Sequence, residues 1–145
     1  MVSWRNPGLG RFSVNVDLAN YGDLVRADAG DIPAQQVRRL TIRGLVDSGA
    51  TRLVIPESVV RELGLQTTGE ATVRYADGHT AHRDMVRAVH LTYGDRSSVF
   101  NAVVEPDRDS ALIGAIVMED LDLVVDCTRQ TLTPRDPERI ISEIE

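Results

Sequence analysis

Short runs in which apolar and polar residues alternate recur along this chain, and turns rich in Gly, Pro and Asp separate them. In Phe12–Leu18, for example, every second residue is apolar. A period of two residues is typical of a β-strand that buries one face. Such runs and shorter apolar ones cover residues 12–18, 37–46, 53–55, 71–75, 79–86, 86–93, 98–104, 111–113, 121–125 and 131–133. Many short strands separated by turns predict a small all-β barrel or sandwich.

The segments between these runs predict hairpins and a few short helices. Asp77-Gly78 and Gly94-Asp95 each join two strand-like runs, and Asp-Gly is a strong hairpin signal. Glu57–Leu63 is predicted as a helix, because Pro56 suits its first turn and Gly64 its end. The remaining predictions are a one-turn helix from Gly114 through Asp120, a terminal helix over Glu138–Ile144 and turns over Ala19–Gln36.

The length and the charge of the chain narrow its possible functions. At 145 residues it is expected to form one domain, residues 1–145, with a real hydrophobic core. All 16 basic residues are Arg, which excludes chemistry that needs a Lys, such as Schiff-base formation or a P-loop. The net charge of −6 argues against a nucleic-acid partner, which would require clustered positive charge.

The expected location is the cytoplasm. No apolar run approaches the roughly 20 residues of a membrane helix, and no signal peptide is evident. Cys127 is the single cysteine, so no internal disulfide can form, which fits a reducing compartment. We therefore expect a soluble protein with no membrane partner.

The segment with the clearest chemistry is Gly44–Thr51, in which an apolar strand leads into Asp47-Ser48-Gly49-Ala50. Gly49 allows a tight turn, and backbone N–H groups of such a turn can point at the carboxylate of Asp47. Peptide hydrolysis by carboxylates needs two of them sharing one proton. The chain has one such turn, so a second carboxylate has to come from a second copy.

This segment resembles the active-site loop of retroviral-like aspartic proteases, in which an apolar run precedes Asp-Ser/Thr-Gly-Ala. Tyr75-Ala76-Asp77-Gly78 resembles the tip of the flap hairpin of that family. Ala111-Leu112-Ile113-Gly114 resembles its second signature, in which two apolar residues and a Gly open a short helix. The resemblance covers roughly Phe12–Leu132, and among relatives the chain is more similar to small cellular members in bacteria than to the viral enzymes.

The resemblance implies an all-β, closed barrel-like lobe with one or two short helices, working as a homodimer. It implies an aspartic endopeptidase that cleaves an extended peptide or protein substrate bound in apolar pockets. One copy of Asp47 would act as general base on water and the other as general acid. Ser48 would hydrogen-bond across the dimer, and Asp77 and Gly78 would cover the substrate. We expect no cofactor and no metal in this protein.

Two departures from the viral pattern are visible. Viral members carry acidic residues just beyond the Ala and an Arg in the helix after the second Gly, whereas this chain has Thr51-Arg52 and Ala115-Ile116. The last residues, 135–145, are acidic and look helical, so the dimer contact is expected to differ from the interleaved termini of viral enzymes.

Other interpretations of the same residues stay open at this point. Asp47 could be a turn former, and the whole chain could be an inactive dimeric peptide-binding module on the same fold. A role of Ser48 as a serine nucleophile is disfavoured, because no G-x-S-x-G motif surrounds it. His79 and His82, three residues apart on a strand, would point to opposite faces and do not suggest a shared metal. Tyr75 could be either a packing aromatic or a functional one. The acidic clusters at residues 107–109 and 119–122 lack the spacing of calcium loops.

Overall fold

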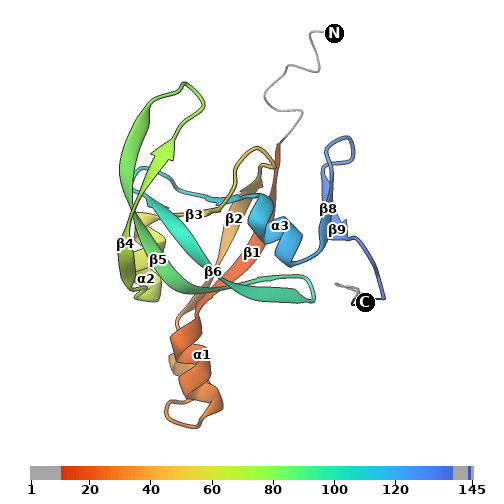
Figure 1. Ribbon diagram of the computed structural model, residues 1–145. Coiled ribbons are helices and arrows are strands. Elements are labelled where there is room, and N and C mark those ends of the chain that lie inside the picture. Colours follow the sequence, from red (N-terminus) through yellow and green to blue (C-terminus); the bar gives the residue numbers. More distant parts are fainter. Residues whose placement is uncertain (1–10, 139–143, 145) are drawn as a thin grey trace.

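The structure is a computed structural model that describes residues 11–138 and residue 144 (Figure 1). Within these residues the strands and helices follow one another in the order listed here. They are β1 (Phe12–Asn20), α1 (Tyr21–Asp28), the 3-10 helix η2 (Ala34–Gln36), β2 (Arg39–Val46), β3 (Leu53–Pro56), α2 (Glu57–Leu63), β4 (Thr67–Arg74), β5 (Thr80–Tyr93), β6 (Arg96–Glu105), β7 (Ala111–Ile113), α3 (Ala115–Asp120), β8 (Leu123–Asp126) and β9 (Thr131–Pro134).

Six strands close into a barrel, which confirms the prediction of an all-β, barrel-like fold. Neighbouring strands pair in the order β1-β2-β7-β3-β6-β5, and β5 pairs again with β1 to complete the ring. β4 extends the sheet beyond β5, so these two strands form a long hairpin that projects from the barrel in Figure 1. Closure leaves most strands without a free edge, and the interior fills with side chains.

The barrel interior is the hydrophobic core. Its largest fully buried side chains come from five of the six barrel strands and from both helices that pack on them. They include Leu18 of β1, Ile55 of β3, Leu63 of α2, Leu91 of β5 and Ile113 of β7. Burial of aliphatic side chains of this size contributes roughly 1.5 to 3 kcal/mol each.

Three α-helices are present in the described residues, which is one more than the one or two that were expected. The additional helix, α1, lies in the stretch that was predicted as turns. Its only buried residue is the charged Asp23. Its apolar residues Tyr21, Leu24 and Val25 have helical spacing, but Tyr21 and Val25 are exposed, so this short face does not pack into the core. The side chain of Asn20 caps it by accepting a hydrogen bond from the Asp23 N–H at 3.0 Å.

Two of the predicted strands, 79–86 and 86–93, form one continuous strand, β5. A β-bulge interrupts its pairing with β6 between Val86 and Val89, and Ala88 adopts a positive φ of 60°. The bulge increases the local twist, so the strand pairs with β4 at one end and with β1 at the other. The first predicted strand after the turns begins at Arg39 rather than Val37.

The β8–β9 hairpin is a separate two-stranded sheet beside α3 (Figure 1). Side chains from the barrel hold it: the Tyr93 hydroxyl donates to the Leu132 carbonyl at 2.8 Å. The buried guanidinium of Arg96 donates to the carbonyls of Leu121 and Asp136 at 3.1 and 2.8 Å. Of the predicted helix at residues 138–144, residues 139–143 lie outside the described residues.

No helix of the described residues is both long enough and apolar enough to cross a membrane.

Candidate active site

The loop after β2, residues 47–52, is called the Asp47 loop below. The Asp47 N–H donates to the Ile113 carbonyl at 3.1 Å, which extends the parallel pairing of β2 with β7 by one residue. The Asp47 carboxylate accepts a hydrogen bond from the Gly49 N–H at 3.0 Å, and the Ala50 N–H donates to the Asp47 carbonyl at 3.1 Å. The carboxylate thus sits at the end of a barrel strand in a turn held by its own backbone.

The second predicted motif, Leu112-Ile113-Gly114, packs directly against this loop. The N–H groups of Ala115 and Ile116, at the start of α3, donate to the carbonyls of Ala50 and Thr51 at 2.8 and 3.0 Å. A Cβ atom on Gly114 would lie 2.5 Å from the Arg52 carbonyl oxygen, closer than van der Waals contact allows. Only Gly fits this backbone-to-backbone approach, so the two motifs that lie far apart in the sequence form one unit.

The predicted flap is the hairpin of β4 and β5 with its turn at Tyr75–His79, called the flap hairpin below. The Gly78 N–H donates to the Tyr75 carbonyl at 2.9 Å, and Gly78 has a positive φ of 92°. The Asp77 carboxylate accepts a hydrogen bond from the His79 N–H and also contacts Nδ1 of the His79 ring. These His79 contacts lower the pKa of the exposed Asp77 carboxyl below its usual value.

Tyr75 anchors the flap hairpin to the barrel. Its hydroxyl donates to one carboxylate oxygen of Glu105, while Arg83 donates to the other at 2.7 Å. The Tyr75 ring stacks on the His79 ring, with ring centroids 4.4 Å apart. Burial, followed by the Glu105 carboxylate, raises the pKa of the Tyr75 hydroxyl. Tyr75 is therefore both a packing aromatic and part of a polar network.

A cavity of about 490 Å³ lies between the Asp47 loop and the flap hairpin; it is called the loop–flap cavity below. Gly49 and Ala50 line it on one side and Tyr75 on the other. Its remaining lining residues are Thr51, Arg52, Val54, Ala71, Thr72, Val73, Arg74, Val103, Glu105, Arg108 and Leu112. A cleft of this size and mixed lining is typical of a peptide or small-molecule site.

Four of the eleven predicted site residues line this cavity: Gly49, Ala50, Tyr75 and Leu112. Asp47 and Ser48 lie beside the cavity without lining it, and Ser48 is exposed. Ala76, Asp77 and Gly78 are exposed at the tip of the flap hairpin and are not part of the cavity wall.

The charged lining residues Arg52, Arg74, Glu105 and Arg108 were not predicted. Arg52 directly follows the Asp47 motif, so its position could have been inferred from that motif. The other three come from β4, β6 and the segment before β7, and only the folded chain places them together.

The two histidines considered as metal ligands do not meet. His79 lies in the flap turn, whereas His82 lies on β5 and contacts Thr72 at 3.3 Å. Within the residues that the structure describes, no three His, Cys, Asp or Glu side chains are placed to hold a metal ion.

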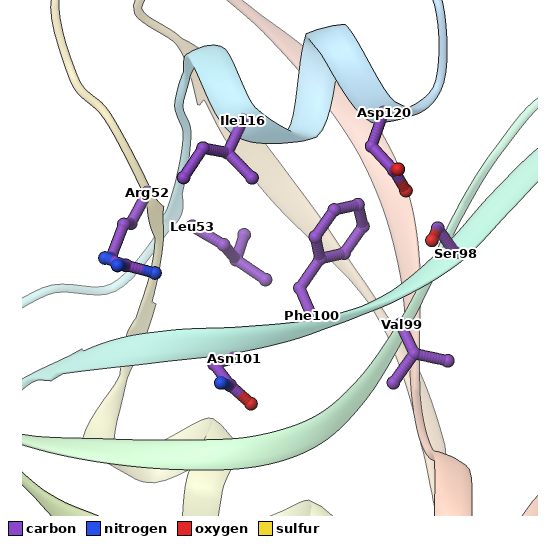
Figure 2. A pocket seen from close by; sticks show the side chains of 8 residues that line it. All are labelled: Arg52, Leu53, Ser98, Val99, Phe100, Asn101, Ile116 and Asp120. Atoms are coloured by element: carbon purple, nitrogen blue, oxygen red, sulfur yellow. The ribbon is translucent and has the colours of Figure 1, made fainter. Parts of the chain in front are cut away.

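A second cavity, of about 300 Å³, lies on the other side of the Asp47 loop and is shown in Figure 2. Its apolar lining residues are Leu53, Val99, Phe100 and Ile116. Arg52 lines this cavity as well as the loop–flap cavity. In Figure 2, Arg52 and Asp120 lie on opposite sides of this cavity.

A closed six-stranded barrel with a carboxylate in a Gly-containing loop, backed by an apolar-apolar-Gly segment, defines a single lobe of the aspartic protease class. The family model described as aspartyl protease matches residues 32–124, well over half of the chain. The chain belongs to this aspartyl protease family.

Comparison with solved structures supports the fold. EIAV protease complexed with the inhibitor HBY-793 matches this chain with a TM-score of 0.54 at 15% sequence identity. The match covers 77% of this chain and 88% of the EIAV protease chain. A comparison with curated proteins found no match.

Proposed function

We propose that this protein is an aspartic endopeptidase that acts as a homodimer, in which two copies of Asp47 activate water against a peptide bond. The observation that carries the proposal is the fit of the Asp47 loop onto Gly114 and the start of α3. Main-chain contacts fix the carboxylate at the end of a barrel strand, next to a cleft beneath a projecting hairpin. A rigidly held group of this kind is what acid–base chemistry requires.

The dimer follows from the chemistry of the reaction. The Asp47 loop supplies one carboxylate, whereas two carboxylates that share one proton can act as base and acid together. A twofold axis next to the loop would bring the second Asp47 from an identical chain. Ser48, exposed beside Asp47, is placed to hydrogen-bond to the partner loop.

In the proposed reaction the ionised Asp47 takes a proton from water while the water oxygen bonds to the carbonyl carbon of the peptide. The protonated Asp47 of the other copy gives its proton to the carbonyl oxygen. The C–N bond of the tetrahedral intermediate then breaks as the protonated carboxyl group gives its proton to the leaving amine. The ionised carboxyl group takes a proton from one hydroxyl of the intermediate, so the product is a carboxylic acid and the pair again holds one proton. The protons belong to the pair of carboxyl groups, so the pair titrates as a unit.

The test is mass spectrometry of a diverse peptide mixture incubated with the wild type and with Asp47→Asn at acidic and neutral pH. The wild type should cleave, and Asp47→Asn should lower the rate at least about a thousandfold because both carboxyl groups of the pair are replaced. Cleavage should fade as the pH rises and both carboxyl groups ionise. The protein concentration must be high enough to populate a dimer.

A matched control is Asp31→Asn, which changes an exposed carboxylate in the turn after α1, far along the chain from the loop. This variant should cleave like the wild type. Equal cleavage by the wild type and Asp47→Asn would rule out the proposed mechanism. Peptide binding by a confirmed dimer without any cleavage would instead indicate a binding module.

A further inference from the structure

The floor of the loop–flap cavity matches the apolar pockets that the family resemblance implies. Val54, Val73, Val103 and Leu112 supply aliphatic side chains from four different strands. Such a floor binds the hydrocarbon part of a substrate side chain through burial of apolar surface. On this evidence alone, the cavity would select apolar side chains.

The charged residues of the same cavity change that expectation, because they are predominantly positive. Arg52, Arg74 and Arg108 line the cavity, and Glu105 is its only acidic lining residue. Both oxygens of the Glu105 carboxylate already accept hydrogen bonds, from Tyr75 and from Arg83. Arg83 does not line the cavity, so it neutralises Glu105 from outside.

The three guanidinium groups of the cavity keep their charge uncompensated. Within the described part of the chain, no ion pair involves Arg52, Arg74 or Arg108. Arg108 donates to the carbonyl and the hydroxyl of Ser110 at 3.0 and 3.2 Å, and both of these acceptors are neutral. Asp107 and Asp109 flank Arg108 in the sequence but do not line the cavity. A cleft with positive charge in a protein of net charge −6 marks a local preference for anions.

We propose that the loop–flap cavity selects substrates that present a carboxylate side chain, and glutamate above all. The two methylene groups of glutamate would lie on the aliphatic floor, and its carboxylate would reach the guanidinium groups. Aspartate is one methylene shorter, so it reaches them less well. This inference rests on the proposed function, because it names the substrate class of the same cleft.

The experiment compares matched peptides derived from a site that the wild type cleaves in the mixture described above or, if nothing is cleaved, from the peptides of that mixture that carry Glu. At the position whose side chain the mixture shows to be selected, the peptides carry Glu, Asp, Gln or Lys. The Glu peptide should be cleaved about tenfold or more faster than the Gln peptide at low substrate concentration, since charge-assisted hydrogen bonds are lost with Gln. Added salt should reduce this ratio, because it screens the guanidinium charges.

Variants locate the preference in the cavity. The double variant Arg52→Gln/Arg74→Gln should bring the Glu-to-Gln ratio close to one while the Gln peptide itself is still cleaved. If the double variant fails to fold, the single variant Arg74→Gln replaces it in the experiment, because it changes an exposed flap residue. This single variant should lower the Glu-to-Gln ratio partway. Arg43→Gln, on the exposed face of β2 and outside the cavity, should leave the ratio unchanged.

Binding of the same peptides to Asp47→Asn, followed by fluorescence anisotropy, separates this inference from the proposed function. Asp47-dependent cleavage with equal binding and cleavage of the Glu and Gln peptides would overturn the inference alone. Tighter binding of the Glu peptide without any cleavage would overturn the proposed function and leave the inference standing. Absence of both cleavage and binding would overturn both.

Discussion

The Asp47 loop and the flap hairpin face each other across the same cavity, yet the chain holds them in different ways. The Asp47 loop is held by main-chain hydrogen bonds to β7 and α3 and by the close approach of Gly114. The flap hairpin is tied to the barrel by side chains, through Tyr75, Arg83 and Glu105. Main-chain contacts cannot swing away on a rotamer change, whereas side-chain contacts can. The loop that carries the carboxylate is therefore held by backbone atoms, and the hairpin on the other side of the cavity is held by side chains.

The largest effect on stability is expected when a main-chain contact of the Asp47 loop is disrupted. Gly114→Ala would place a Cβ atom 2.5 Å from the Arg52 carbonyl oxygen, and neither backbone can move without disturbing the Asp47 loop. The free energy of unfolding should fall by about 3 kcal/mol, as measured by urea denaturation. Gly44→Ala is the matched control, because its Cβ would meet side-chain atoms of Ile113 at 2.9 and 3.0 Å, which can shift. A smaller loss for Gly114→Ala than for Gly44→Ala would contradict the comparison.

An intermediate effect is expected at the α1 corner, where a buried carboxylate depends on a side-chain partner. Two hydrogen bonds from the Arg38 guanidinium, at 2.8 and 3.0 Å, help to lower the pKa of Asp23 to about 2 from 3.8. The folded pKa lies below the unfolded one, so this stabilisation is complete above about pH 5 and is lost as the pH falls toward 2. Asp23→Asn should lower the free energy of unfolding at neutral pH by about 2 kcal/mol.

The pH dependence gives the Asp23 prediction its control. Urea denaturation of the wild type and Asp23→Asn should show the gap between them narrowing from pH 5 to pH 2.5. A gap that stays constant over this range would show that the ion pair with Arg38 does not stabilise the fold.

The smallest effect is expected from loosening the flap hairpin. Tyr75→Phe removes the hydrogen bond to Glu105 but leaves the ring stacked on His79, so the free energy of unfolding should change by no more than about 1 kcal/mol. The change should appear locally, as faster hydrogen exchange of the flap amides. Tyr21→Phe, at an exposed tyrosine of α1, should leave that exchange unchanged. Unaltered exchange in Tyr75→Phe would show that the hydroxyl does not restrain the flap.

The same contrast explains which parts of the molecule could be predicted from the sequence. The Asp47 loop, the Gly114 segment and the flap turn each carry a short motif of adjacent residues, so each could be found in the sequence, although the contact that joins the first two is long-range. Helix α1 could not be predicted, because it buries only a charged residue whose partner, Arg38, is 15 positions away. The charges of the loop–flap cavity come from side chains brought together only by barrel closure. Short sequence motifs therefore predict the main-chain scaffold, whereas contacts between side chains far apart in the sequence cannot be predicted from them.

The close fit of Gly114 also bears on how such a protein can diversify. Main-chain hydrogen bonds hold the Asp47 loop against β7 and α3. The side chains of Thr51 and Arg52 are exposed, so they take little part in holding it. Under the proposed function, replacing them is expected to alter which peptides are accepted without displacing the carboxylate. The fold thus tolerates substitution of Thr51 and Arg52 but not of Gly114. Positions 51 and 52 are therefore suitable starting points for changing the specificity of the cleft.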